Sequence, residues 1–185
     1  MERVEEILAW LTSIPDWTLY LVLGIAAALE NLIPPIPADV SVLAGGVIAG
    51  LGGADPTVLF FVVWLSNVAS ALFVYAMGSR YGPRFFDGRI GRFLLAPAQL
   101  HMLAAAYRRY GFPIILFSRF LPVFRPVVPA FAGLTHVGFW RTAIPIGLAS
   151  GLWYGFLVFA GSLAGANWRT VVSAFTDAGA WLWAV

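Results

Sequence analysis

Cysteine and lysine are both absent from this 185-residue chain, and charge of either sign is scarce. Without cysteine the protein has no disulfide, no thiolate metal site and no cysteine nucleophile. Charged residues make up 11% of the sequence, against about 25% in ordinary soluble domains, whereas hydrophobic residues make up 61%. One domain of this length cannot bury so much apolar surface in its own core, so lipid must cover part of it. The composition therefore predicts a membrane protein.

The cations are all arginine, and they flank apolar runs instead of forming a continuous basic stripe. With a net charge of only +2, this pattern argues against a nucleic-acid partner. The densest group, interrupted by the single acid Asp87, consists of Arg80, Arg84, Arg89, Arg92, Arg108 and Arg109. The positive-inside rule places this segment, residues 80–110, on the cytoplasmic side, and its second part, residues 97–110, is expected to be a surface helix.

Prolines interrupt the first long apolar region. Residues 18–33 would rise about 24 Å as a helix, which is less than the hydrocarbon thickness of about 30 Å. Three prolines between positions 34 and 37 then break the run, which resumes as far as residue 53. Two short limbs around a break predict a re-entrant helical hairpin over residues 18–53, and a tilted, kinked full span is the alternative. A spanning helix is expected next, from Pro56 to about Gly78.

The second half of the chain repeats this pattern. Residues 111–163 contain a second broken hairpin, 111–135, and a second spanning helix from Phe139 to Leu163. A shift of 88 residues aligns the two broken segments, with coincidences at Pro34/Pro122, Val40/Val128, Ala44/Ala132 and Gly45/Gly133. An odd number of crossings in each half would invert the second copy, as in many secondary transporters. The predicted fold is an all-α polytopic membrane protein with two inverted-repeat halves, each with a re-entrant helical hairpin and a spanning helix.

The predicted organisation is a single membrane domain over residues 1–185. Its parts are an interfacial amphipathic helix (1–16), a first repeat (18–79), the arginine-rich segment (80–110), a second repeat (111–163) and a C-terminal apolar helix (167–185). Glycine steps at Gly45–Gly46 and from Gly147 to Gly155 predict close packing between helices.

Four charged residues lie inside the two broken segments. Glu30 and Asp39 belong to the first segment, and Arg119 and Arg125 belong to the second. A charge at bilayer depth costs about 3 kcal/mol or more, so the acids and arginines are expected to pair across the two segments. Two structural roles are alternatives: the acids as caps of the hairpin helices, and the arginines as donors to free carbonyls at the breaks.

The chemistry of these side chains predicts a division of roles. Arg119 and Arg125 are predicted to bind an anionic head group, because a guanidinium grips phosphate oxygens with a fixed fork and keeps its charge. Glu30 and Asp39 are predicted to couple binding to protons, because desolvation raises the proton affinity of a carboxylate. No catalytic residue, metal or cofactor is expected.

Three motifs carry a resemblance to a known family. They are Glu30 with Pro34 and Pro37-Ala-Asp39; Gly111-Phe-Pro with Ser118-Arg-Phe-Leu-Pro-Val-Phe-Arg-Pro126 and Pro129-Ala-Phe-Ala-Gly133; and Tyr75-Ala-Met-Gly-Ser-Arg-Tyr-Gly82. With these motifs the chain resembles the DedA family, the bacterial branch of the VTT or SNARE-associated membrane proteins, over about Leu19 to Gly165. The resemblance implies movement of lipid phosphate. Bacterial members are linked to recycling of undecaprenyl phosphate across the cytoplasmic membrane, with dependence on the proton motive force, and eukaryotic relatives to phospholipid scrambling.

The predicted function is therefore a transporter or flippase, and not an enzyme, in a bacterial cytoplasmic membrane that it crosses several times. The expected partners are membrane lipids, an anionic lipid phosphate such as a polyprenyl phosphate, and protons; homo-oligomerisation is left open. A scramblase or small-ion transporter of the same fold, a lipid-pyrophosphate phosphatase and a non-transporting scaffold are the alternatives. The phosphatase is disfavoured, because Ser118 is the one nearby nucleophile and neither hairpin contains histidine.

Overall fold

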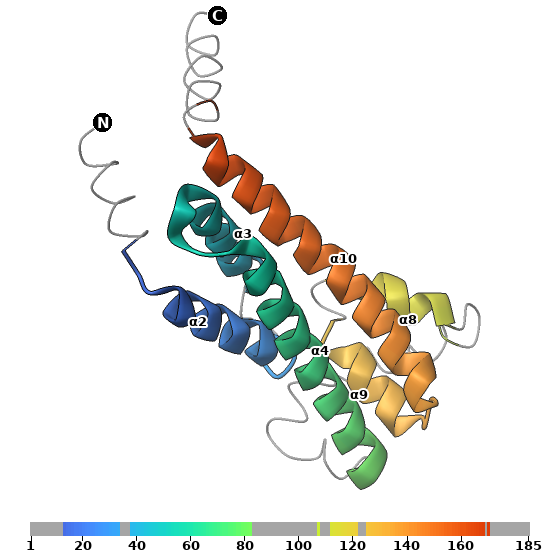
Figure 1. Cartoon of the computed structure of the whole chain (residues 1–185). Coiled ribbons are helices and arrows are strands. Elements are labelled where there is room, and N and C mark those ends of the chain that lie inside the picture. The colour runs from blue at the N-terminus through green and yellow to red at the C-terminus, as the bar shows by residue number, and fades with distance from the viewer. Residues whose placement is uncertain are drawn as a thin grey trace, which may run out of the picture.

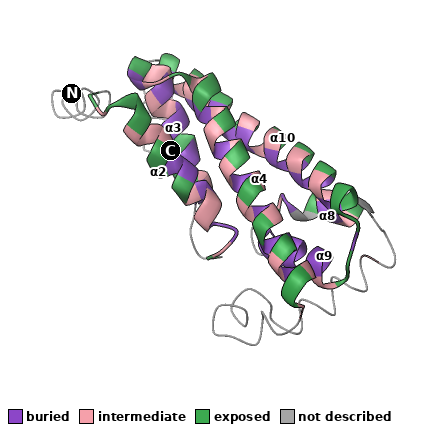
Figure 2. Ribbon diagram, turned by 60° about the horizontal axis from the view of Figure 1, so that its bottom comes forward, coloured by how far each residue is buried: buried purple, intermediate pink, exposed green. Residues whose placement is uncertain are grey.

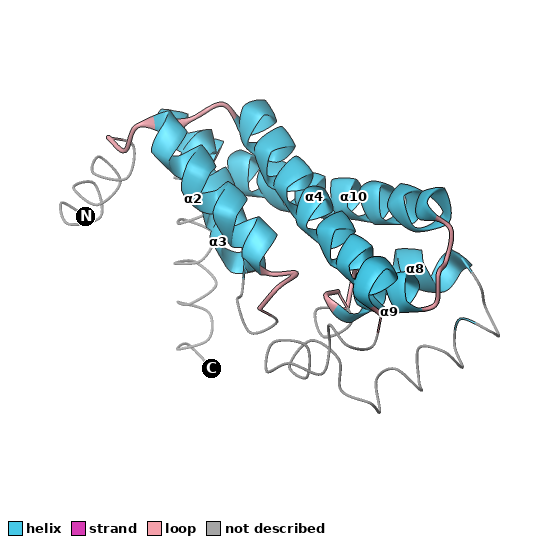
Figure 3. Ribbon diagram, turned by 90° about the horizontal axis from the view of Figure 1, so that it is seen from below, coloured by secondary structure: helices cyan, strands magenta, loops and turns pink. Residues whose placement is uncertain are grey.

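The computed structural model describes residues 13–33, 38–82, 107, 112–121, 125–168 and 170. Within these ranges all regular structure is helical, as predicted, and no strand occurs (Figure 3). In chain order the elements are α2 (Asp16–Leu29), α3 (Ala38–Ile48), the π-helix η1 (Ala49–Gly53), α4 (Pro56–Tyr81), α8 (Phe112–Ser118), α9 (Val127–Leu134) and α10 (Phe139–Ala166). The helices predicted over 1–16, 97–110 and 167–185 fall largely outside the described residues.

Of the described helices, α4 and α10 are long and apolar enough to cross a membrane. They contain 26 and 28 residues, so at about 1.5 Å per residue each exceeds a hydrocarbon thickness of about 30 Å. The two helices predicted to span are therefore confirmed as helices. Each runs three residues beyond its predicted C-terminal end.

The ends of α4 follow from local chemistry. Asp55 Oδ1 accepts hydrogen bonds from the N–H groups of Thr57 at 2.7 Å and Val58 at 3.1 Å, and Pro56 occupies the first helical position. The hydrogen bonds from Val58 and Thr57 hold the pKa of the Asp55 carboxyl below its usual range. The helix ends at Gly82, whose φ of 58° is a left-handed conformation that glycine adopts without strain.

Apolar side chains cover the outer faces of the helices. In Figure 2, buried residues face neighbouring helices and exposed residues face outward along α2, α4 and α10. Large exposed hydrophobic residues on these faces are Leu21, Phe61, Leu65, Phe73, Leu148, Leu152, Phe156 and Leu163. Soluble monomers rarely expose so much contiguous apolar surface, so these faces fit contact with lipid.

Short helices form the two broken segments. The first contains α2, with 14 residues, and α3, with 11 residues, which η1 extends. The second contains α8, with 7 residues, and α9, with 8 residues. At about 1.5 Å per residue, none of these limbs reaches across a hydrocarbon layer of about 30 Å. Their insertion into the membrane as re-entrant hairpins stays a prediction.

The four limbs pack on the two long helices in a reciprocal arrangement (Figure 1). α2 packs against α4, and α8 packs against α10, so each first limb lies on the long helix of its own half. α3 packs along α10, and α9 packs against α4, so each second limb lies on the long helix of the other half. Two halves with related structures would pack in this way, each with its second limb on the long helix of the other half. Inversion of the second half within the membrane stays a prediction.

Glycine lets α3 approach the backbone of α10. A Cβ atom at Gly46 would lie 2.6 Å from the Val158 carbonyl oxygen, and one at Gly161 would lie 2.5 Å from that of Leu43. Because no larger residue fits at these distances, the predicted role of glycine in close helix packing is confirmed at Gly46. The prediction is wrong at Gly147, where a Cβ atom would meet nothing within 4 Å.

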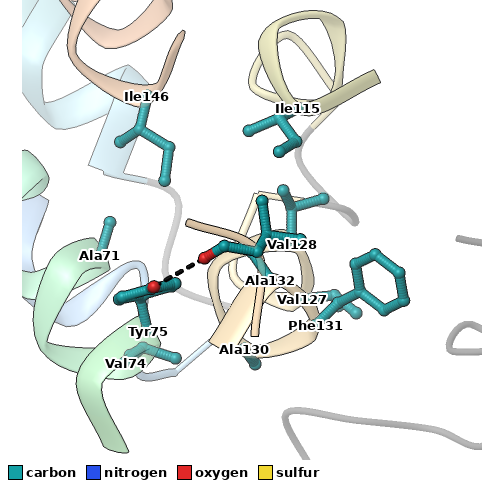
Figure 4. Packing of buried hydrophobic residues seen from close by; sticks show 11 residues of the cluster. Ala71, Val74, Tyr75, Ile115, Val127, Val128, Ala130, Phe131, Ala132 and Ile146 are labelled. Carbon is teal, nitrogen blue, oxygen red and sulfur yellow. Dashed lines mark hydrogen bonds between the residues drawn. The ribbon is translucent and has the colours of Figure 1, made fainter. Parts of the chain in front are cut away.

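Two apolar clusters fill the space between the helices. One joins α4, α8, α9 and α10, and within it the Tyr75 hydroxyl donates to the Val137 carbonyl oxygen at 2.7 Å (Figure 4). The other lies among α2, α3, α4 and α10. Along α4, the buried Asn67 lies one turn from Val63 of the second cluster and one turn from Ala71 of the first. Asn67 therefore marks a polar layer between the clusters, and the candidate site lies in this layer.

Candidate functional site

The two chain breaks bring four charged residues together. Glu30 directly follows α2, and Asp39 lies in the first turn of α3. Arg119 directly follows α8, and Arg125 lies just before α9. Glu30, Arg119 and Arg125 are buried, with at most 6% of their surface exposed, whereas Asp39 is half-buried. All four residues singled out from the sequence therefore lie in one region.

Arg125 is the centre of the ion-pair cluster. Its Nη1 donates to Asp39 Oδ1 at 2.9 Å, and its Nη2 donates to Asp39 Oδ2 at 3.2 Å. Nη1 also donates to Glu30 Oε1. The guanidinium lies 5.8 Å from the ring centroid of Trp153 and 5.9 Å from that of Tyr154, within range of a cation–π contact. The expected pairing across the two broken segments is confirmed for this arginine.

Arg119 makes a different set of contacts. Its Nη1 donates to Asn31 Oδ1 at 2.9 Å and to the Arg125 carbonyl oxygen at 3.0 Å. Arg125 Nε donates in turn to the Arg119 carbonyl oxygen at 3.0 Å, so the two arginines brace the second break. Donation to backbone carbonyl oxygens at the break is the structural role considered for the arginines. Arg119 makes this contact through Nη1 and Arg125 through Nε. No carboxylate among the described residues forms an ion pair with Arg119.

The helix ends act differently on the two acids. Asp39 lies at the positive end of the α3 dipole, which favours a carboxylate, and Trp153 Nε1 donates to its Oδ1 at 3.0 Å. Glu30 lies at the negative end of the α2 dipole, which disfavours a carboxylate. Arg125 and the Tyr154 hydroxyl, which donates to Glu30 Oε2 at 2.6 Å, offset this effect. Helix capping therefore does not explain the position of Glu30.

A chain of neutral polar side chains, missed by the sequence reasoning, extends from the charges to α4 and α10. Asn31 Nδ2 donates to Ser70 Oγ at 2.8 Å and to the Asn67 carbonyl oxygen at 3.0 Å. Asn67 Nδ2 donates to Tyr154 Oη at 2.9 Å, and Ser150 Oγ donates to Asn67 Oδ1 at 3.3 Å. A signal for Asn67 was present, because an amide in the middle of an apolar span usually has a partner inside the protein.

The charges of the cluster balance. The two acids and two arginines sum to zero, and they lie in a region with little solvent exposure. Loss of one partner from a buried pair leaves an uncompensated charge and typically costs about 3–5 kcal/mol. Such a cluster responds strongly to one added charge, whether a proton or a bound anion. Among the described residues, no three His, Asp or Glu side chains lie close enough together to hold a metal ion.

Comparison with known proteins identifies one family and several relatives. The VTT domain matches residues 36–163, a range that includes Asp39, Arg119 and Arg125. Undecaprenyl phosphate transporter A of Bacillus subtilis (strain 168) is 27% identical over 169 residues, covering 91% of this chain and 81% of the relative. An alkaline phosphatase-like protein of Lactococcus lactis subsp. cremoris is 26% identical over 148 residues, covering 77% and 69% respectively. An uncharacterized membrane protein of Haemophilus influenzae is 27% identical over 137 residues, covering 73% and 63%. No solved structure matches the chain.

Proposed function

This chain is a membrane protein of the VTT domain family, and from that premise we propose that it transports an anionic lipid phosphate across the membrane together with protons. The proposed location is a bacterial cytoplasmic membrane. The first candidate substrate is undecaprenyl phosphate, which appears in the name of the Bacillus subtilis relative. In this proposal Arg119 and Arg125 bind the phosphate, and Glu30 and Asp39 couple its movement to protons.

The observation that carries the proposal is the state of Arg119. Its side chain is 1% exposed, and its Nε and Nη2 have no hydrogen-bond partner among the described residues. Buried polar groups are almost always hydrogen-bonded, so two such donors on one guanidinium require an explanation. Nε and Nη2 lie on the same edge of the guanidinium, the edge that binds two oxygens of a phosphate in parallel. The unused edge of Arg119 therefore presents the hydrogen-bond donors that a phosphate group needs.

Charge balance ties the anion to a proton. The undisturbed cluster is neutral, and a phosphate monoester brings about one to two negative charges near neutral pH. Uptake of one proton by Glu30 or Asp39 gives the cluster a net charge of about +1, which the single negative charge of a monoanionic phosphate cancels. A neutral complex is far cheaper to hold in a low-dielectric layer than a charged one. The proposal therefore moves one proton with each lipid phosphate monoanion.

Aromatic side chains beside the cluster favour a lipid over a free anion. Asp39, the least buried of the four charges, accepts its hydrogen bond from Trp153. The Trp153 ring lies 5.8 Å from that of Phe120 and 6.3 Å from that of Phe156, which is exposed on the apolar face of α10. The charged site thus adjoins a membrane-facing aromatic surface, where the hydrocarbon chain of a lipid can lie while its phosphate reaches the arginines.

The test is movement of labelled undecaprenyl phosphate in proteoliposomes, with and without a proton gradient. The protein should move this lipid faster than protein-free vesicles do, and the gradient should raise the rate. Parallel assays with phosphatidic acid, phosphatidylcholine and inorganic phosphate separate a lipid-phosphate transporter from a scramblase and from a small-anion transporter. Absence of any movement above that of protein-free vesicles contradicts the proposal. Release of inorganic phosphate from undecaprenyl pyrophosphate would instead identify a phosphatase.

A further inference from the structure

Hydrogen bonds along one chain of side chains fix the direction of the Tyr154 hydroxyl proton. Asn67 Nδ2 donates to the carbonyl oxygen of Ala27 at 3.0 Å, and this contact settles which end of the amide is the nitrogen, because a carbonyl oxygen can only accept. Asn67 Oδ1 accepts from Ser150, and Nδ2 also donates to Tyr154 Oη. Tyr154 therefore accepts from Asn67, and its single proton goes to Glu30 Oε2, 2.6 Å away.

As a result, donors occupy both carboxylate oxygens of Glu30. Tyr154 donates to Oε2, and Arg125 Nη1 donates to Oε1. A proton on either oxygen neutralises the carboxylate and makes that oxygen a weaker acceptor, so the donor that faces it is held much less strongly. Tyr154 has no alternative acceptor in the described part of the network, because its other contact is the donor Nδ2 of Asn67. Arg125 does have an alternative, since Asp39 also holds it through both oxygens.

We propose that Tyr154, oriented by Asn67, is the positioning residue that makes proton uptake by Glu30 and release of Arg125 from Glu30 a single event. The inference rests on the proposed function of the site and adds its coupling step. With Oε2 held by Tyr154, the proton binds at Oε1 and displaces Arg125 Nη1. The freed Nη1 of Arg125 then donates to the phosphate, beside the unused Nε and Nη2 edge of Arg119.

The proton comes from a hydronium ion in the surrounding water: one of its O–H bonds breaks as the new O–H bond to Glu30 Oε1 forms, a water molecule is left, and no other covalent bond changes. The charged or titratable groups that face Glu30 are Arg125 before α9, Asp39 on α3, Tyr154 on α10 and Arg119 after α8. In its described contacts α4 contributes only the neutral Asn67 and Ser70 to this network. The cluster therefore changes from neutral to +1 when Glu30 takes up the proton, and a phosphate monoanion restores neutrality.

Tyr154→Phe is the informative variant. It removes the donor from Oε2, so Glu30 can take its proton there while Arg125 stays on Oε1. We expect this variant to move undecaprenyl phosphate in proteoliposomes at a rate that no longer depends on the proton gradient. Its affinity for this lipid should fall about tenfold, because one hydrogen bond from a charged donor to phosphate is not made. Tyr75→Phe is the matched control. It removes the hydroxyl of another buried tyrosine, which donates to the Val137 carbonyl oxygen and lies away from the charges.

An infrared measurement separates failure of this inference from failure of the proposed function. The carboxylic-acid band of Glu30, assigned by its loss in Glu30→Gln, should appear in the wild type on acidification together with undecaprenyl phosphate. In Tyr154→Phe it should appear on acidification alone. The inference is overturned if Tyr154→Phe keeps the gradient dependence of Tyr75→Phe, or if both proteins show the band over the same pH range without lipid. If the wild type moves no lipid, the proposed function fails, and the infrared comparison of wild type and Tyr154→Phe still decides the inference.

Discussion

Arg125 and Asp39 are joined by two parallel hydrogen bonds although they lie 86 positions apart in the chain. One residue belongs to the second broken segment and the other to the first, so this contact ties the two halves together at their breaks. A movement that separates the breaks must give Arg125 another anionic partner, because an unpaired buried guanidinium is costly. In the proposed transport cycle, that partner is the phosphate of a lipid.

Arg119→Lys tests whether Arg119 binds phosphate through two parallel hydrogen bonds. Lysine keeps the positive charge but cannot present two parallel donors, so affinity for undecaprenyl phosphate should fall at least about tenfold. Binding to protein in nanodiscs measures this directly. Arg141→Lys is the control, because Arg141 is exposed at the start of α10 and makes no contact with the cluster in the described structure. Equal binding by wild type and Arg119→Lys would show that Arg119 only braces the chain break.

Glu30→Gln tests the proton-coupling role. Glutamine keeps the size and can still accept from Arg125 or Tyr154, but it cannot take up a proton. We therefore expect binding of lipid phosphate to persist and stimulation by a proton gradient to disappear. Asp16→Asn, which neutralises an exposed acid at the start of α2, should behave like wild type in the same assay. A Glu30→Gln protein that still responds fully to the gradient would assign coupling to another group.

Gly46→Ala tests the contact between the two halves along α3 and α10. The added Cβ would lie 2.6 Å from the Val158 carbonyl oxygen, so the helices must move apart. Such overpacking should lower the free energy of unfolding by about 1–3 kcal/mol, seen as a lower melting temperature in detergent. Gly147→Ala offers the contrast, because a Cβ there meets nothing within 4 Å. It should be neutral or stabilising, by up to about 1 kcal/mol. Equal destabilisation by both substitutions would contradict this description of the interface.

Asp55 gives a pH dependence that is separate from the buried charges. Its folded-state pKa lies below the usual value because the N–H groups of Val58 and Thr57 bind the ionised carboxylate. Its stabilising effect is therefore complete above the usual pKa and is lost as the pH falls through the lower, folded-state value. Asp55→Asn should keep a capping oxygen and remove this part of the pH dependence. Thermal unfolding of wild type and Asp55→Asn across the acidic pH range measures this difference. If the melting temperatures of both proteins change equally with pH, the Asp55 cap is not the source of the pH dependence.

Charge within apolar sequence made part of this site predictable. Glu30, Asp39, Arg119 and Arg125 stood out because each is costly in lipid, and the structure brings all four together. Which arginine pairs with which acid was not readable, because it depends on side-chain packing between segments that meet only in the folded protein. Tyr154 was missed because tyrosine is common in apolar helices, and its role depends on the direction of one hydroxyl group.

Helix ends were predictable to within a turn where local chemistry dominates. Pro56 starts α4, as expected, and the Asp55 cap was not predicted. The helix continues past the predicted Gly78 to its cap at Gly82. Gly78 instead provides a close contact with α9, where a Cβ would lie 3.0 Å from the Ala130 carbonyl oxygen. After α9 the chain reverses at His136, which adopts a φ of 53° where glycine is the usual residue. Tertiary packing decides the role of Gly78. The turn at His136 is instead closed locally, by hydrogen bonds from the His136 N–H to the Gly133 carbonyl oxygen at 3.1 Å and from the Val137 N–H to that of Ala132 at 2.9 Å.

The number of protons moved with each lipid phosphate is the sharpest test of the proposed coupling. Proteoliposomes that contain a pH indicator and labelled undecaprenyl phosphate allow both fluxes to be measured in the same vesicles. Because the buried cluster is neutral before binding, we expect one proton for each lipid phosphate monoanion in the wild type and none in Glu30→Gln. Movement of the lipid by the wild type without any accompanying proton flux would contradict the coupling of phosphate to protons.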